Sequence, residues 1–597
     1  MMKGLKTSVF SKILNRVLYW RINHISNRNF LIVASIIIGI VSALAAVVLK
    51  TFVHWLQGIP LYFSKISTTH LWFIFIPLSG IILTVLVTKL LFKGKLEKGL
   101  GNIIYSISRK SAKVDKDKMY SHIITSGITV GLGGSAGLEA PIVITGAAIG
   151  SNIASALNLG YRERSLLLAC GAASGIAAVF NSPIAGVIFA LEVLIAEISI
   201  PVFIPLLIST ATAILVSKAL YKGQLFYLVT SDWYFHAIPF YIILGLLCGL
   251  LSVYMLRTTL RIEQIFKKKD AIWQKAIFGG LGLGVLIFLF PPLFGEGYNT
   301  IKSLLDGNYS ALVNFSLLEP FKENPWVIIV VTFLIILLKV IATSLTVCSG
   351  GNGGIFAPSL FNGALAGFGL ALFVNTTGIS NLNINNFIIV GMAGILSGVV
   401  HAPLTSIFLI AEITGGYVLF VPLMIVSALS YFIGKYFEPY SIYTKNLAQS
   451  GLLFTSNKDS DILSQINLDD LIERDFIPLK SSGTLKSLVD AFAVSNRNVY
   501  PVVDDDKNYL GVIYLEKVKD LLFRSDLYHQ LKITDITDYT ALYIEKNESM
   551  ESAMKKFESS NLWSIPVTDG TKYIGFVSRS NILSYYRKIL KQSAALF

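Results

Sequence analysis

The sequence has little charge for its length. Only 14% of its 597 residues are Asp, Glu, Lys or Arg and 53% are hydrophobic, whereas soluble proteins have about 25% charged residues. Three widely separated cysteines give neither a disulfide framework nor metal-ligand spacing. The seven histidines are scattered, and no phosphate-binding loop or H-E-x-x-H motif indicates an enzyme. We therefore expect an integral membrane protein with no catalytic residues and no metal site.

Positive charge is unevenly distributed along the chain. Residues 1–30 contain six lysines and arginines and no acidic residue, and further basic clusters lie at Lys89–Lys98 and Arg257–Lys269. Between them, Gly58–His70 has a single lysine and Thr376–Asn386 has no charge. This alternation places the basic segments in the cytoplasm and argues against nucleic-acid binding. We expect residues 1–30 to form a cytoplasmic basic helix, and the protein to lie in the inner or plasma membrane.

Residues 31–454 contain two kinds of apolar segment. Six uninterrupted stretches are long enough to cross a bilayer: Leu31–Leu56, Leu71–Phe92, Ile200–Tyr221, Ile238–Leu256, Ile277–Phe294 and Trp326–Leu345. In contrast, Ile123–Ile198 and Leu345–Glu438 are repeatedly interrupted by Gly and Pro. Irregular backbone at membrane depth is tolerated only where protein or a water-filled cavity satisfies its polar groups, so these two regions predict broken helices in a channel or transporter.

The two interrupted regions repeat each other. Gly133–Pro141 (GGSAGLEAP) and Gly350–Pro358 (GGNGGIFAP) both fit GG-x-x-G-x-x-A-P. Downstream, Gly171–Glu192 and Gly391–Glu412 have the same spacing from Gly to Pro to Glu, and the equivalent glutamates predict a shared structural role. We expect an all-α polytopic fold with an inverted repeat, its halves at residues 31–221 and 238–454, and a substrate site near the membrane midplane.

Each GG-x-x-G-x-x-A-P segment predicts the start of a helix. Its glycines permit tight turns and close approach, and its proline is tolerated at a helix start. Two such N-termini, each with free N–H groups and partial positive charge, would bind an anion without a lysine or arginine. Glu139 lies at the first start, where its carboxylate can occupy the anion's place, so we predict that it is the gate. The predicted anion-binding residues here are Gly137, Leu138, Gly354, Ile355 and Phe356.

These motifs resemble those of the CLC family of chloride channels and chloride/proton antiporters. Gly137–Pro141 (GLEAP) is similar to the family's G-[RK]-E-G-P motif, and Gly354–Pro358 (GIFAP) matches its G-x-F-x-P motif. The resemblance implies transport of chloride or a similar small anion across the bilayer by a voltage-gated homodimer. It extends over the membrane region and, with the C-terminal segment below, over nearly the whole chain.

The resemblance also assigns three positions on the cytoplasmic side. A tyrosine after the last membrane helix would contact the anion; Tyr443 and Tyr440 are candidates, and Tyr443 has the better spacing. Leu100 stands where the family has an anion-binding serine. Val193 stands where antiporters carry a second, proton-relaying glutamate, which favours a passive channel. The alternatives are an antiporter, with Glu197 taking over the relay, and a secondary transporter for another solute.

Residues 455–597 differ in composition, with 18 basic and 20 acidic residues. Tyr500–Asp504 (YPVVD) and Ile565–Asp569 (IPVTD) are each preceded by an amphipathic helix, Leu485–Ser495 and Met550–Ser559, and followed by a glycine-led strand. This α/β pattern resembles a tandem pair of CBS domains, here residues 473–527 and 533–594, and we expect the pair to be cytoplasmic.

Nucleotide binding by this pair is not favoured by its sequence. The CBS motif that binds ribose is [ST]-x-x-D, and the corresponding segments are Tyr514–Lys517 (YLEK) and Ser578–Asn581 (SRSN). Neither keeps the aspartate, so we expect no adenine-nucleotide cofactor. For the CBS pair we expect a structural role at least as much as a role in nucleotide sensing.

Overall fold

The computed structural model describes residues 26–66, 72–94, 96–195, 200–221, 230–268, 271–314, 319–450, 466, 468–560 and 562–595. The chain separates into two compact units, Met1–Leu453 and Phe454–Phe597. Most of the predicted basic helix at 1–30 lies outside the described residues.

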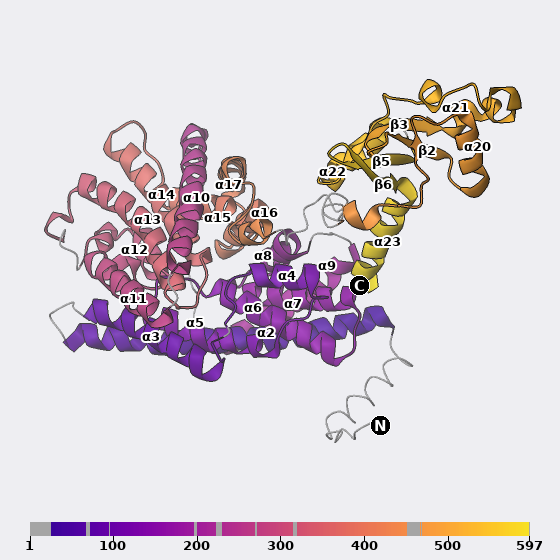
Figure 1. Ribbon diagram of the computed structural model, residues 1–597. Helices are drawn as coiled ribbons and strands as arrows, with labels where there is room; N and C mark the ends of the chain where they lie inside the picture. Colours follow the sequence, from indigo (N-terminus) through magenta and orange to yellow (C-terminus); the bar gives the residue numbers. More distant parts are fainter. Residues whose placement is uncertain are drawn as a thin grey trace, which may run out of the picture. The chain divides into compact units, whose positions relative to one another are not determined.

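The regular elements of the first unit, in its described part, are all helices (Figure 1). Nine of the described helices are long and apolar enough to cross a membrane, with shorter apolar helices between them, which confirms the polytopic fold with broken helices. The α-helices are α2 Asn27–Ile66, α3 Trp72–Leu91, α4 Gly101–Arg109, α5 Ser121–Gly131, α6 Glu139–Ala156, α7 Tyr161–Phe180, α8 Pro183–Phe189, α9 Ile200–Leu220, α10 Ile238–Lys267, α11 Ile272–Leu289, α12 Tyr298–Leu305, α13 Pro325–Cys348, α14 Phe356–Thr376, α15 Ile384–Val400, α16 Pro403–Ile413, α17 Phe420–Phe437 and α18 Lys445–Gln449.

Three predicted spans end well away from the predicted residue. The first, predicted to end at Leu56, continues in α2 to Ile66. The stretch predicted to run to Phe294 ends as a helix at Leu289, because Pro291 and the residue after it lack the N–H groups that would continue α11. A short 3₁₀ turn, η4 (Pro291–Leu293), follows. Conversely, α10 continues eleven residues beyond Leu256 to Lys267, because a helix can extend past the apolar layer once its side chains become basic.

The internal repeat is visible as two equivalent series of three helices. In the first series α6, α7 and α8 follow one another, and in the second α14, α15 and α16. Both middle helices end in a left-handed residue, Asn181 (φ 57°) and His401 (φ 61°). The next helix then begins with a proline, Pro183 or Pro403, where a missing N–H costs nothing.

Glycines allow the first two helices of each series to touch backbone to backbone. A Cβ atom added to Gly146 would lie 2.1 Å from the carbonyl oxygen of Gly171, and one added to Gly363 would lie 2.2 Å from that of Gly391. One turn later, a Cβ on Gly367 would lie 1.9 Å from the carbonyl oxygen of Phe387. Small residues four apart are a general means of close helix packing in membranes, and here both repeats use it.

Glu192 and Glu412 each form hydrogen bonds with the opposite repeat. The Glu192 carboxylate, in the π-helical turn η2 (Ala190–Leu194), accepts hydrogen bonds from the N–H groups of Leu404 (3.2 Å) and Thr405 (2.8 Å) at the start of α16. The Glu412 carboxylate accepts from the N–H groups of residues 184 (3.0 Å) and 185 (2.9 Å) at the start of α8. Each carboxylate therefore stabilises the N-terminus of the other repeat's helix, as a shared structural role requires.

The second unit contains two similar three-stranded sheets in the orders β1-β2-β3 and β4-β5-β6. In each sheet the first two strands are parallel and the last two antiparallel, with a register shift at the same point, Val502/Val503 and Val567/Thr568. The elements are β1 Leu479–Lys480, α20 Leu485–Val494, β2 Val499–Val503, β3 Tyr509–Tyr514, α21 Leu515–Val518, β4 Ile544–Glu545, α22 Met550–Ser560, β5 Ser564–Asp569, β6 Lys572–Ser578 and α23 Arg579–Ala595. This repeat confirms the CBS-pair fold.

Contacts across the two sheets join the CBS repeats. The rings of Phe476 and Phe576 stack at 4.3 Å between centroids. Arg497 lies over Phe476 and forms ion pairs of 2.7 Å with Glu473 and Asp475. Its hydrogen bonds hold the pKa of the Asp475 carboxyl below its usual value. The pair is therefore packed as one unit through aromatic and charged contacts.

We predict that Gly367→Ala destabilises the membrane unit by at least about 2 kcal/mol, because its methyl group would overlap the Phe387 carbonyl. Gly282→Ala is the matched control. It also lies inside a helix, and its Cβ would meet nothing closer than 3.6 Å, so it should be neutral or stabilise by up to about 1 kcal/mol. Thermal unfolding of the two variants in detergent measures the difference. Equal unfolding temperatures would contradict the proposed backbone contact.

Candidate anion site

The two repeated segments meet at their central glycines. Gly137 and Gly354 form an antiparallel bridge in which the N–H of each donates to the carbonyl oxygen of the other, at 2.8 and 2.7 Å. Their first glycines, Gly133 (φ 94°) and Gly350 (φ 114°), both adopt a left-handed conformation that other residues rarely tolerate. Antiparallel pairing of equivalent residues is what an inverted repeat produces about its two-fold axis.

The bridge places two helix starts side by side. Helix α6 begins at Glu139 and α14 at Phe356, each two residues after its bridged glycine. A Cβ on Gly354 would lie 3.2 Å from the N–H nitrogen of Ala140, and one on Gly137 would lie 3.0 Å from that of Ala357. The N–H groups that begin the two helices therefore lie around one small region, whose positive potential suits an anion.

Glu139 occupies that region. Its side chain is 1% exposed, and its Oε1 accepts a 2.5 Å hydrogen bond from the hydroxyl of Tyr298. Its Oε2 lies against Gly137 and next to the N–H of Ala357, without a hydrogen bond of normal geometry. A buried carboxylate with one loosely held oxygen, facing helix N–H groups, is placed where an anion would compete with it.

The other predicted anion ligands lie at the same helix starts. Leu138 and Ile355 are the residues immediately before α6 and α14, and both are nearly completely buried, as is Phe356. The Phe356 ring packs on that of Phe180, with 5.6 Å between centroids. The structure thus brings Gly137, Leu138, Gly354, Ile355 and Phe356 together at the two helix starts.

Tyr443 and Leu100 lie together at a second point of the same core. Tyr443 is 7% exposed and interacts electrostatically with Glu139. Its hydroxyl has no hydrogen-bond partner among the described residues. A Cβ on Gly101 would lie 2.8 Å from the Tyr443 carbonyl oxygen, so the start of α4 contacts the tyrosine. Leu100 is 1% exposed and packs in the apolar core. Tyr440, the other candidate, is 37% exposed.

Val193 lies in the π-helical turn η2, next to Glu192. Its side chain is partly buried and packs against the main apolar core, and η2 contacts α4. Glu197, the alternative proton relay, lies outside the described residues.

Sequence reasoning missed two groups beside Glu139. Tyr298 donates to its carboxylate, and Glu296 interacts with it electrostatically. The sequence feature that could have indicated them is Gly295–Tyr298 (GEGY). In this segment an acidic residue stands between two glycines, shortly after a double proline. This segment lies far from the repeated motifs in sequence, so its proximity to them could not be deduced.

The two positions that lack the ribose-binding aspartate are both engaged within the CBS unit. Lys517 forms a 2.9 Å ion pair with Asp538. The side-chain amide of Asn581 donates to the Leu471 carbonyl oxygen at 3.0 Å.

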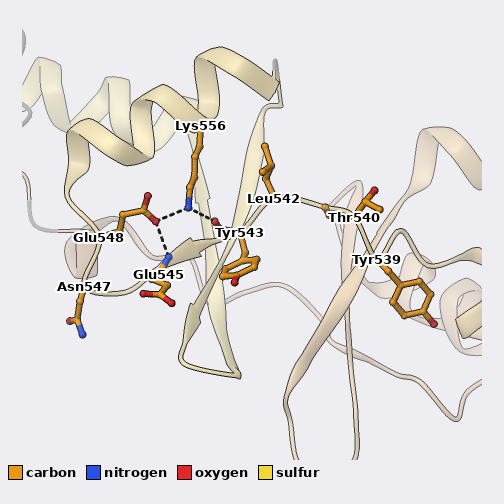
Figure 2. Close-up of a pocket in the computed structure, with 9 residues that line it drawn as sticks. Tyr539, Thr540, Leu542, Tyr543, Glu545, Asn547, Glu548 and Lys556 are labelled. Atoms are coloured by element: carbon orange, nitrogen blue, oxygen red, sulfur yellow. Dashed lines mark hydrogen bonds and ion pairs between the residues drawn. The ribbon is translucent and has the colours of Figure 1, made fainter.

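A cavity of about 670 Å³ lies in the second CBS repeat, and Figure 2 shows the residues around it. Lys556 donates to Glu548 and to the Tyr543 carbonyl oxygen, both at 2.8 Å, and Glu548 also accepts from the N–H of Glu545 at 3.1 Å. Lys556, the basic residue of the cavity, is therefore already paired with Glu548.

The fold and the paired helix starts define a membrane protein built to pass small anions. The family model for voltage-gated chloride channels matches residues 80–435, and that for the CBS domain matches residues 533–588. The chain therefore belongs to the voltage-gated chloride channel, or CLC, family.

Curated relatives agree with this assignment. Chloride channel protein CLC-e of Arabidopsis thaliana is 25% identical over 555 residues, which cover 82% of this chain and 76% of that protein. The voltage-gated ClC-type chloride channel ClcB of Escherichia coli is 32% identical over 339 residues, covering 55% of this chain and 73% of that protein.

Solved structures share the fold. A slow cyanobacterial Cl⁻/H⁺ antiporter aligns with a TM-score of 0.59 at 22% identity, covering 71% of this chain and 98% of that one. A eukaryotic CLC transporter aligns with a TM-score of 0.60 at 17% identity, covering 93% of this chain and 99% of that one.

We predict that ATP binds the protein weakly or not at all, because Lys517 and Asn581 replace the aspartates and are held by other partners. Titration calorimetry of ATP into the purified full-length protein, and into a 455–597 fragment, measures the affinity. A micromolar dissociation constant in either titration would contradict this prediction.

Proposed function

We propose that the protein is a passive, gated chloride channel in which Glu139 is the gate. The observation that carries the proposal is the bridge between Gly137 and Gly354, which aims two helix N-termini at the place where the Glu139 carboxylate lies. Chloride is the anion that the family model and the curated relatives name.

The chemistry of the site suits rapid passage. Helix N-termini supply partial rather than full positive charge, so a dehydrated anion is stabilised without being held as tightly as by a lysine. Conduction requires binding that is favourable enough to enter and weak enough to leave. The unpartnered hydroxyl of Tyr443 supports a second contact along the path, and its burial favours it over Tyr440. Leu100 offers only backbone groups, which weakens anion discrimination at that point.

The gate works by competition. While ionised, the Glu139 carboxylate occupies the positive region between α6 and α14 and excludes another anion. Protonation removes its charge, and with it the attraction to the helix ends, so chloride can replace it. The channel should therefore pass more chloride as the pH falls.

Passive conduction is supported by the absence of a carboxyl group at position 193. An antiporter must deliver protons to the gate from the cytoplasmic side as well. Val193 cannot bind a proton, and its side chain packs in the apolar core. Proton-coupled exchange is the alternative function, because two of the similar structures are described as proton antiporters.

Three further features belong to the proposal. The positive-inside pattern places the N-terminus and the CBS pair in the cytoplasm, with the protein in the inner or plasma membrane. Family resemblance supports a homodimer and voltage-dependent gating. The paired charges of the CBS unit support a structural role for it.

We predict that Glu139→Gln raises chloride flux several-fold at neutral pH and removes its pH dependence, because glutamine imitates the protonated gate. Chloride efflux from proteoliposomes at several pH values measures both effects. Glu323→Gln, the same change at an exposed position, is the control and should behave as the wild type. Unchanged flux and an unchanged pH response in Glu139→Gln would exclude Glu139 as the gate.

We predict that transport is not coupled to protons. The test imposes a chloride gradient on sealed proteoliposomes and follows internal pH. Protons should distribute only according to the membrane potential, because Val193 provides no relay. Uphill proton movement at a fixed ratio to chloride would contradict the channel and establish the antiporter.

A further inference from the structure

A turn outside both GG-x-x-G-x-x-A-P segments holds two polar side chains against the start of α6. Between η4 and α12 the chain passes through Gly295 (φ 61°) and Gly297 (φ 95°), conformations that favour glycine. The N–H of Gly295 donates to the Gly133 carbonyl oxygen at 3.2 Å, which ties this turn to the first repeated segment. Glu296 and Tyr298 are thereby fixed beside the gate.

Both side chains interact with the Glu139 site directly. The Tyr298 hydroxyl donates to Glu139 at 2.5 Å. The Glu296 carboxylate faces the backbone N–H of Leu138 and interacts electrostatically with Glu139. Two carboxylates therefore lie at the same positive helix end.

Positive charge nearby balances this pair. Lys339 is fully buried, and its Nζ donates to the carbonyl oxygens of Leu293 (3.2 Å) and Gly295 (2.8 Å). Lys50 is 8% exposed and donates to the Ala178 carbonyl oxygen at 2.9 Å. The titratable groups that face Glu296 from the surrounding elements are Lys50 of α2, Glu139 of α6, Tyr221 after α9, Tyr298 of α12 and Lys339 of α13.

The formal charges of this cluster cancel when both carboxylates are ionised and both lysines are protonated. One added proton then gives the cluster a net positive charge, which favours the arrival of an anion just as the gate is neutralised. Two carboxylates in one site each raise the other's affinity for a proton. Glu139 and Glu296 therefore titrate as a coupled pair.

Glu296 is the more accessible member of the pair. It is partly exposed, whereas Glu139 is 1% exposed. At the far end of α12, the Leu305 carbonyl oxygen accepts from Asn385 at 3.1 Å. Asn385 lies in Thr376–Asn386, the uncharged segment predicted to face away from the cytoplasm. Eight helical residues rise about 12 Å, so α12 spans about that distance between Tyr298, beside Glu139, and the contact with Asn385.

We infer that Glu296 is a positioning residue for the gate: its carboxylate, beside the Tyr298 hydroxyl, sets the proton occupancy of Glu139 and hence the external pH at which the anion path opens. This inference rests on the proposed gating role of Glu139. The two neighbours act in opposite directions. The negative charge of Glu296 favours a protonated Glu139, whereas the hydrogen bond from Tyr298 favours an ionised one.

The test measures chloride efflux from proteoliposomes as a function of external pH. In Glu296→Gln the repulsion is lost, Glu139 stays ionised to lower pH, and the activation midpoint should fall by about one pH unit. In Tyr298→Phe the midpoint should move the other way, to higher pH. Glu296→Asp keeps the charge and should restore most of the wild-type profile, which a purely structural role would not explain. Glu323→Gln is the exposed control and should not shift it.

An unshifted midpoint in active Glu296→Gln would overturn the inference. If that variant does not fold, Glu296→Asn removes the same charge with a smaller side chain and is judged by the same criterion. The Glu139→Gln variant distinguishes failure of the proposed gate from failure of the Glu296 inference. A pH response that persists in Glu139→Gln refutes the gate and this inference with it. A response that disappears there, with no shift in the neutral Glu296 variants, refutes this inference alone.

Discussion

The pair of hydrogen bonds between Gly137 and Gly354 positions everything else in the membrane unit. It joins the two repeats at equivalent residues, and both α6 and α14 begin two residues later. A side chain at either glycine would overlap the facing helix start or the gate itself. Because the bonded groups are backbone, the geometry of the site is independent of any long side chain, and its positive potential comes from peptide dipoles.

Around this bridge the structure balances charges that would be costly alone. A buried carboxylate is expensive in a membrane, and Glu139 is stabilised by two helix ends and by Tyr298. Glu192 and Glu412 are stabilised in another way. The carboxylate of each accepts hydrogen bonds from N–H groups at a helix start of the opposite repeat. The same kind of helix start thus forms a fixed carboxylate contact at α8 and α16 and the proposed anion site at α6 and α14.

Periodicity and internal repetition predicted the fold class, the broken helices and the CBS pair, because duplicated motifs such as GG-x-x-G-x-x-A-P report backbone requirements directly. The position of Glu139 at a helix start was also predicted, and its gating role remains a proposal. Glu296 and Tyr298 could not be predicted in the same way, since their role depends on a turn that folds back more than 150 residues along the chain onto Gly133. The end of α11 was misplaced because apolar composition continued past Leu289, whereas the double proline decided where the helix stops.

The central claim is that the helix starts at Glu139 and Phe356 form an anion site for which the Glu139 carboxylate competes. The most direct measurement is anomalous diffraction from bromide in crystals of the Glu139→Gln variant. The account predicts a bromide peak within hydrogen-bonding distance of the N–H group of Ala357, at the place that the Glu139 carboxylate otherwise fills. Crystals of an actively transporting variant that show bromide elsewhere along the path, and none between α6 and α14, would contradict it.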